Sequence, residues 1–128
     1  QDCHVILRGG KAPNYSAADV DAACALLKDA GLREQVMIDL SHANSSKQHA
    51  RQIVVAEDVA AQVAAGDARI MGVMIESHLE EGRQDIVAGQ QLKPGVSVTD
   101  ACISFAQTVP VLRQLAAAVR ARRERNTP

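Results

Sequence analysis

Three side chains that are able to bind a divalent metal follow or close short segments of the sequence. His42 comes just after the apolar run 36–40, Glu76 closes the run 70–76, and Asp100 follows a further short segment. One imidazole and two carboxylates offer nitrogen and oxygen donors, which suit Mn, Fe, Co or Zn better than Mg or Ca. Spacing alone leaves the alternatives open that His42 is a hydrogen-bonded loop histidine and that Asp100 is the N-cap of a helix.

The segment Arg8-Gly9-Gly10-Lys11 is a candidate site for an anion such as a phosphate group. An arginine presents a fork of donors that matches a phosphate, and glycines let backbone N–H groups come close to an anion. The spacing of a P-loop is absent. Composition alone favours a simpler alternative, a turn at the end of a strand with a solvated Arg8.

The elements that must position these residues are predicted from apolar runs, helical spacing and breakers. Ser16 with Asp19 resembles a capping box at the start of a helix, which Gly31 ends. A long polar loop is expected from 76 to 97, because the segment contains several Gly and Pro residues. Strands are expected at 5–7, 36–40, 70–75 and, more briefly, 96–98, and further helices at about 47–65 and 109–123, with a helical stretch opening at Asp100.

Apolar strands that alternate with helices indicate a parallel sheet covered by helices. Both an open doubly wound sheet and a section of a (β/α)8 barrel fit this pattern. Arg8, His42 and Glu76 are each separated by 34 positions, so a regular βα period places them at the same end of the sheet. That carboxyl end binds ligands in both architectures. The regular period favours the barrel, and since a whole barrel needs roughly 250 residues, this chain is expected to form about half of one.

Composition narrows the class of protein and the expected partners. The 128 residues suffice for a single domain, 1–128. A net charge of -1 and 2% aromatic residues argue against nucleic acid or a membrane surface as a partner. An odd set of cysteines without CxxC spacing predicts a reducing, cytoplasmic compartment. A basic cluster near the end of the chain is attributed to a helix C-terminus, where cations favour the dipole.

Other polar residues near these segments are expected to have ordinary roles. His49 is predicted on the solvated face of the second long helix, and Lys47 in solvent at its first turn. His78 is expected in a surface loop, and Cys102 is expected to pack in the interior, because no activating base lies near it in the sequence.

The sequence resembles the metal-dependent, bacterial type I 3-deoxy-D-arabino-heptulosonate 7-phosphate (DAHP) synthases over nearly its whole length. The RGGK segment, the block from Gln35 to Gln48, the GVMIESHL segment and the VTDACI segment carry this resemblance. The corresponding blocks are residues 2–11, 13–16, 35–48, 72–79, 97–103, 112–116 and 119–123.

This resemblance implies an enzyme that joins phosphoenolpyruvate (PEP) to erythrose 4-phosphate and releases phosphate, in the first step of the shikimate route to aromatic amino acids. It implies a homo-oligomer of (β/α)8 barrels and a divalent metal held by Cys, His, Glu and Asp. His42, Glu76 and Asp100 correspond to the last three ligands. Arg8 corresponds to a ligand of the PEP phosphate, and Asp100 is also expected to contact the sugar phosphate, which makes Arg8, His42 and Asp100 the expected catalytic residues.

The sequence departs from the family in one large respect. The early block that carries the metal-binding cysteine is missing, and Cys3, Cys24 and Cys102 do not match it. The other basic residues that hold PEP are missing as well. We therefore expect the C-terminal portion of a synthase, with part of the active site and no activity alone. The alternatives are a non-catalytic fragment that self-associates through exposed strand edges, and an open-sheet phosphate-binding domain.

Overall fold

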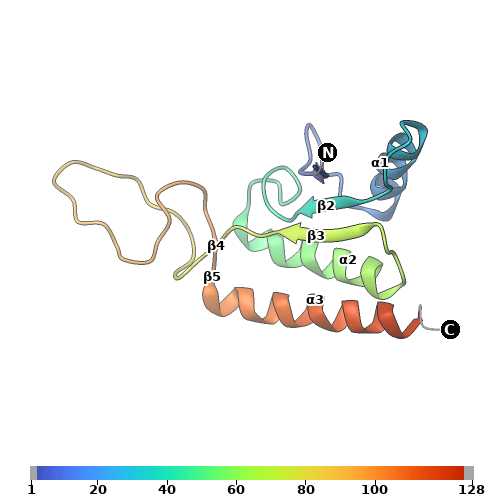
Figure 1. Ribbon diagram of the computed structural model, residues 1–128. Helices are drawn as coiled ribbons and strands as arrows, with labels where there is room; N and C mark the ends of the chain where they lie inside the picture. Colours follow the sequence, from blue (N-terminus) through green and yellow to red (C-terminus); the bar gives the residue numbers. More distant parts are fainter. Residues whose placement is uncertain (1–2, 126–128) are drawn as a thin grey trace.

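The fold is that of a computed structural model, which describes residues 3–125. Three helices accompany a small parallel sheet, and a long excursion extends from its carboxyl end (Figure 1). The elements in chain order are β1 Val5–Leu7, α1 Ala17–Asp29, β2 Val36–Asp39, the 3₁₀ turn η1 His49–Arg51, α2 Gln52–Ala64, β3 Ile70–Met74, β4 Ser77–His78, β5 Ile103–Ser104 and α3 Phe105–Arg125.

The strands pair in parallel in the order β1-β2-β3, so the predicted α/β architecture with parallel strands and helices is confirmed. Val5 pairs with Val36, and Val36 in turn pairs with Ile70, so the strands begin at the same level. Spatial order follows chain order and does not reverse within the described residues. An open doubly wound sheet would show such a reversal at its switch point.

The hydrophobic core lies between the sheet and the helices. Val36 and Ile38 of β2 are fully buried and belong to one core cluster with residues of α1, α2 and α3. Helices α2 and α3 pack against each other beneath the strands (Figure 1). The core is aliphatic, as expected from the low aromatic content.

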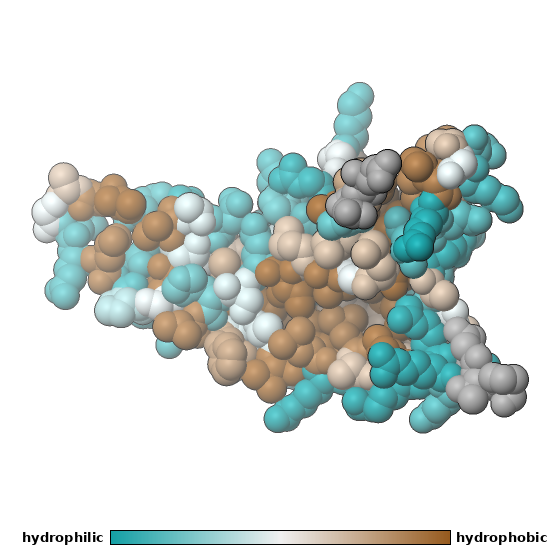
Figure 2. Space-filling view, in the orientation of Figure 1, coloured by the Kyte–Doolittle hydropathy of each residue, from teal (hydrophilic) through white to brown (hydrophobic). Residues whose placement is uncertain are grey.

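The opposite face of the sheet is open. Successive side chains of a strand point to opposite faces, so the registered residues Ile6, Met37 and Gly72 point away from the buried set. Ile6 is 47% exposed, and Met71 of β3 is exposed as well. Apolar side chains gather over the middle of the molecule in Figure 2, where Figure 1 places β3 and α3. This part of the chain therefore leaves apolar surface that its own described residues do not cover.

Local signals located the first helix correctly. The Ser16 side chain caps α1, and the Asp19 carboxylate accepts a hydrogen bond from the Ser16 N–H, which completes the expected capping box. The second long helix begins later than expected, at Gln52. Ser46 and Lys47 have φ values of 54° and 59°, which are left-handed values that no helix continues through.

The final segment differs more from the prediction. Residues 96–98 do not form a strand, since only Ser97 bridges, to Arg83. The paired strands of this region are instead β4 and β5, at the two ends of the long loop. Helix α3 begins at Phe105, so Asp100 does not cap it, and that alternative is wrong. The long polar loop itself is confirmed, and Figure 1 shows it projecting away from the helices.

At the amino end of β3, an ion-pair cluster joins three elements. Arg69 donates to both carboxylate oxygens of Asp67, at 3.0 and 2.7 Å, and to Asp21 of α1 at 2.7 Å. Arg122 of α3 donates to the backbone oxygens of Asp67 and Ile70. The basic end of α3 thus does more than favour the helix dipole, because one of its arginines fastens α3 to the start of β3.

This cluster predicts a pH-dependent contribution to stability. The hydrogen bonds from Arg69 hold the pKa of Asp67 below its ordinary value, against the opposing effect of burial. A lowered folded-state pKa gives stability that is present above about pH 4 and is lost as the pH falls through the folded-state pKa. Asp67→Asn is expected to lower the free energy of unfolding by about 2 kcal/mol at pH 7. The difference from wild type should shrink as the pH falls below about 4.

Urea unfolding followed by circular dichroism at pH 7, 5, 4 and 3 measures this effect. Glu57→Gln removes an exposed carboxylate from α2 and serves as the control for the change in net charge. A difference between Asp67→Asn and wild type that stays constant down to pH 3 would contradict the role of the lowered pKa.

Within residues 3–125, the structure contains no helix that is both long and apolar enough to span a bilayer.

Candidate metal and anion site

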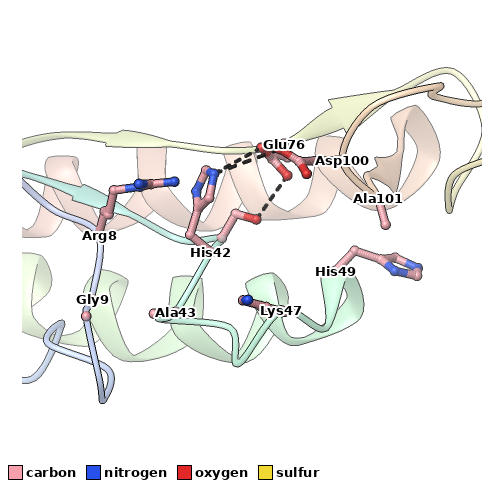
Figure 3. A pocket seen from close by; sticks show the side chains of 11 residues that line it. Arg8, Gly9, His42, Ala43, Lys47, His49, Glu76, Asp100 and Ala101 are labelled. Atoms are coloured by element: carbon pink, nitrogen blue, oxygen red, sulfur yellow. Dashed lines mark hydrogen bonds and ion pairs between the residues drawn. The ribbon is translucent and has the colours of Figure 1, made fainter.

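The carboxyl ends of the strands open into one cavity of about 480 Å³. Arg8, His42, Glu76 and Asp100 all line it, so the expectation that the 34-residue period brings Arg8, His42 and Glu76 to one end of the sheet is confirmed. Figure 3 shows the imidazole of His42 directed toward the two carboxylates, with Arg8 on its other side. The site continues the open face of the sheet, because Arg8 lies on the same face of the extended chain as Ile6.

The geometry of the three candidate ligands fits one divalent ion. His42 Nε2 lies 3.6 Å from Glu76 Oε1 and 4.0 Å from Asp100 Oδ2. Donor atoms bound about 2.1 Å from one ion lie at most about 4.2 Å apart. The two distances from His42 Nε2 are within this limit, and one donor atom from each residue can be chosen so that all three lie within 4.8 Å of one another, slightly above it; among residues 3–125 this is the only such group of three. The nitrogen and oxygen donors suit a transition metal.

His42 is held in place by the strand that precedes it. Its backbone has a φ of 49°, which turns the chain sharply after β2. The ring nitrogen Nδ1 lies 2.7 Å from Asp39 Oδ2, and Asp39 is almost completely buried. This contact directs the second ring nitrogen, Nε2, toward Glu76 and Asp100. His42 is thus hydrogen-bonded, as the simpler alternative required, yet the atom that can bind a metal faces the cavity.

Glu76 is fixed through both its backbone and its side chain. The side-chain amide of Gln52 accepts from the Glu76 N–H at 2.9 Å and donates to the Glu76 carbonyl at 3.0 Å, so it pairs with the backbone as a neighbouring strand would. The Ser41 hydroxyl donates to Glu76 Oε2 at 3.1 Å. Burial raises the pKa of Glu76 and the Asp100 charge adds to that shift, while the Ser41 hydrogen bond and His42 oppose it. A cation at this position would favour the ionised form.

Asp100 comes to the site from the far end of the long loop. Its side chain is 73% exposed, the least buried of the three. The loop is closed just beyond it by backbone hydrogen bonds in both directions between Gly82 and Cys102. Cys102 is buried and its Sγ donates to the Asp100 carbonyl at 3.4 Å, which agrees with the expected packing role. Burial also raises the pKa of the Cys102 thiol, which disfavours a thiolate.

At the candidate anion site, the Arg8 side chain rather than the glycines is open to a ligand. Arg8 is 61% exposed and borders the cavity, with Nε 3.9 Å from Asp39 Oδ2. The Gly9 N–H already donates to Asn14 Oδ1 at 2.6 Å, and the Gly10 N–H to the Ala12 carbonyl. The expected approach of these two backbone N–H groups to an anion is therefore wrong. The guanidinium remains available to receive a phosphate.

Gly9 is needed for a different reason. Its φ is 76°, and a Cβ at this position would lie 2.7 Å from the Cβ of Ala43. The glycine lets the loop after β1 lie against the loop after β2. Arg8 and His42 are brought to one cavity by this close approach.

Three further predictions need correction. His49 does not lie on the solvated face of a long helix, because it sits in the turn η1, lines the cavity and lies 3.8 Å from Glu81. Lys47 is exposed as expected, but it precedes the helix and also borders the cavity. His78 is exposed, as predicted, but it lies in the short strand β4 rather than in a loop, and its Nδ1 contacts the Gly95 carbonyl.

Sequence reasoning missed the residues that support the ligands. Asp39, Ser41 and Gln52 are buried polar side chains that contact His42 or Glu76. Asn44 is fully buried and joins the ends of β1 and β2 by donating to the carbonyls of Leu7 and Asp39. A polar residue inside an apolar strand, such as Asp39 after Ile38, was the one available signal.

Known proteins match the chain over nearly all of its length. The phenylalanine-sensitive phospho-2-dehydro-3-deoxyheptonate aldolase of Escherichia coli K12 is 57% identical over 122 residues, which are 95% of this chain and 35% of that protein. The tyrosine-inhibited aldolase of the same name from Schizosaccharomyces pombe is 54% identical over 129 residues, covering 97% of this chain and 35% of that protein.

A solved structure agrees with these relatives. The phospho-2-dehydro-3-deoxyheptonate aldolase of Francisella tularensis SCHU S4 superposes with a TM-score of 0.89 at 49% identity, covering 93% of this chain and 35% of that one. The chain thus spans about a third of the length of the relatives it matches. Residues 1–113 match the DAHP synthetase I family. The resemblance noted from the sequence is confirmed, and this chain belongs to the DAHP synthetase I family.

Proposed function

We propose that this chain is the C-terminal part of a DAHP synthase, a transferase that condenses PEP with erythrose 4-phosphate to give DAHP and phosphate. The observation that carries the proposal is the convergence of His42, Glu76 and Asp100 on one cavity beside Arg8. The chain's 57% identity to an aldolase of this family supports the assignment of that cavity to the reaction.

Within this proposal, residues 1–128 form a single unit that is about half of a (β/α)8 barrel. Three neighbouring parallel strands in chain order support a barrel section, in which the open sheet face becomes the interior. Exposed Ile6 on β1 and Met71 on β3 mark apolar surface for the remaining strands to cover. Relatives of about three times the length have the residues to supply them.

The proposed metal ligands are His42, Glu76 and Asp100, and the metal is Mn, Fe, Co or Zn. The family resemblance adds a cysteine ligand from a block that is missing from these 128 residues. A bound divalent metal supplies Lewis acidity toward a carbonyl oxygen. Gln52 and Ser41 keep Glu76 facing the cavity through the contacts described above.

The remaining chemistry is positioning by side chains. Arg8 binds the PEP phosphate and holds carbon 3 of PEP toward the aldehyde carbon of erythrose 4-phosphate. A bond forms between these two carbons as the aldehyde C=O π bond breaks and its oxygen takes a proton. Water adds to carbon 2 of PEP and releases a proton, and the carbon 2–oxygen bond to phosphate then breaks, which leaves a ketone at carbon 2 and inorganic phosphate. Asp100, the most exposed of the three candidate ligands, is placed to accept a hydrogen bond from the sugar phosphate. Arg8, His42 and Asp100 are therefore the proposed catalytic residues.

Release of phosphate tests the reaction directly. In the longer protein that carries these residues, we expect phosphate to appear only when PEP and erythrose 4-phosphate are both present. Treatment with EDTA should abolish the release, and added Mn²⁺ or Co²⁺ should restore it. Release from PEP alone would indicate a phosphatase instead, and no release from metal-loaded protein would overturn the proposal.

The isolated 128-residue chain distinguishes the proposal from a self-associating or phosphate-binding fragment. We expect it to show no turnover, because part of the site lies outside it. Light scattering measures whether its open sheet edges pair two copies. Turnover by the isolated chain would contradict the assignment of a partial site. The homo-oligomeric state of the enzyme and its cytoplasmic location stay predictions from the sequence.

A further inference from the structure

Asp39 lies beneath the candidate ligands, and its side chain is only 2% exposed. Its Oδ1 accepts a hydrogen bond from the Ser41 N–H at 2.7 Å. Its Oδ2 lies 2.7 Å from His42 Nδ1 and 3.9 Å from Arg8 Nε. Both oxygens therefore face donor groups. One buried carboxylate contacts the candidate metal ligand and the candidate phosphate ligand at the same time.

The contact between Asp39 and His42 determines which ring nitrogen carries the proton. An ionised carboxylate only accepts hydrogen bonds, so Nδ1 of His42 must donate. In the neutral imidazole, Nε2 then carries the free lone pair. Nε2 is the atom that lies 3.6 Å from Glu76 Oε1 and 4.0 Å from Asp100 Oδ2. A metal binds to that lone pair. The hydrogen bond made by the other ring nitrogen determines which nitrogen carries it.

We propose that Asp39 is a positioning residue, which holds His42 in the Nδ1–H tautomer, aims Nε2 at Glu76 and Asp100, and restrains Arg8 from the other side. The inference rests on the proposed function, in which His42 binds the metal. Asp39 itself lies behind the imidazole and is not among the side chains that line the cavity. It therefore acts through His42 and Arg8 rather than by touching a substrate.

A positioning role and a purely structural role of Asp39 make opposite predictions about which of two substitutions weakens metal binding more. In Asp39→Asn, the amide oxygen still accepts from the Ser41 N–H, so the amide NH₂ faces Nδ1. Turning the amide over would set the NH₂ against the Ser41 N–H instead. Two donors do not pair, and the imidazole is driven to the Nε2–H tautomer, in which Nε2 has no free lone pair for a metal.

Asp39→Ala, by contrast, removes the acceptor without imposing a tautomer, but it leaves a buried gap and an unpaired Ser41 N–H. We therefore expect Asp39→Ala to be the less stable variant and Asp39→Asn the weaker metal binder. A structural role alone would make alanine worse in both measurements. If the tautomer matters, alanine therefore causes the larger loss of stability, while asparagine causes the larger loss of metal affinity.

The test uses the longer protein in its metal-free form, titrated with Co²⁺ and followed by visible absorption. Asp39→Asn is expected to weaken Co²⁺ binding about 10- to 100-fold, and Asp39→Ala less. Asp85→Asn, which removes an exposed carboxylate of the long loop, is the control and should bind Co²⁺ as wild type does. Loss of affinity in Asp39→Ala equal to or greater than that in Asp39→Asn would overturn the inference.

Nitrogen-15 NMR of the histidine rings separates this inference from the proposed function. In the metal-free wild type, Nδ1 of His42 should be protonated, and in Asp39→Asn the proton should move to Nε2. An unprotonated Nδ1 in the wild type overturns the inference by itself, whether or not the variants fold. If His42→Ala leaves Co²⁺ affinity unchanged, His42 is not a metal ligand and that part of the proposed function fails. The tautomer of His42 is tested separately, by the nitrogen-15 spectrum alone.

Discussion

Under the proposed function, replacing His42 with alanine is expected to lower the turnover of the longer protein about 1,000-fold, even at saturating metal. The imidazole is the one nitrogen donor of the candidate group, and its Nε2 lies 3.6 Å from Glu76 Oε1 and 4.0 Å from Asp100 Oδ2. A metal-bound carbonyl contributes several kcal/mol to transition-state stabilisation, and about 4 kcal/mol corresponds to three powers of ten in rate. Phosphate release with both substrates measures turnover, and Co²⁺ titration measures the accompanying loss of affinity.

His78→Ala is the matched control for this experiment. It removes an exposed imidazole of strand β4 that does not line the cavity. We expect its turnover to remain close to that of wild type. Unchanged turnover of His42→Ala at saturating metal would show that His42 is not a ligand, while loss of turnover in both variants would indicate a general effect on folding.

The largest loss of stability is expected from Asn44→Ala. The side chain is fully buried and accepts from the Asn14 N–H at 2.8 Å. It also donates to the carbonyls of Leu7 at 3.0 Å and Asp39 at 2.7 Å. Each buried polar group left without a partner costs about 1–3 kcal/mol, so we expect the free energy of unfolding to fall by about 4 kcal/mol. Urea unfolding followed by circular dichroism measures it.

A second substitution at the same position separates hydrogen bonding from packing. Asn44→Asp keeps the volume and the acceptor but cannot donate to the two carbonyls, so it should destabilise about as much as alanine. Gln91→Ala, at an exposed position of the long loop, is the control and should change little. If Asn44→Asp is as stable as wild type, the hydrogen bonds to Leu7 and Asp39 do not hold the two strand ends together.

Asn44 and Gly9 together explain how the site is assembled. Asn44 ties the end of β1 to the end of β2, and Gly9 lets the two following loops pack closely. Arg8 and Asp39, which lie at these strand ends, are consequently held within 3.9 Å of each other. Substitution of Asn44 or Gly9 should therefore weaken phosphate and metal binding, although neither residue is itself a candidate ligand.

Local patterns predicted a large part of the fold. The capping box at Ser16 and the short apolar runs located α1 and three strands, because these signals depend on residues close together in the chain. The regular 34-residue spacing placed Arg8, His42 and Glu76 at one edge, because parallel strands joined by helices bring their carboxyl ends together. The long resemblance to type I DAHP synthases identified the family, and the matches confirm it.

Only the tertiary structure decided the supporting contacts and the details of the long loop. Gln52 and Glu76 are 24 residues apart in the sequence, and Asn44 and Leu7 are 37 apart, so no local pattern predicts either contact. Residues 96–98 looked like a strand because they are β-branched or small, yet their partners lie elsewhere in the loop and only Ser97 bridges. The residue types of the site were readable from the sequence because chemistry requires them. Their orientation depended on buried hydrogen bonds between distant segments, which exist only once the chain has folded.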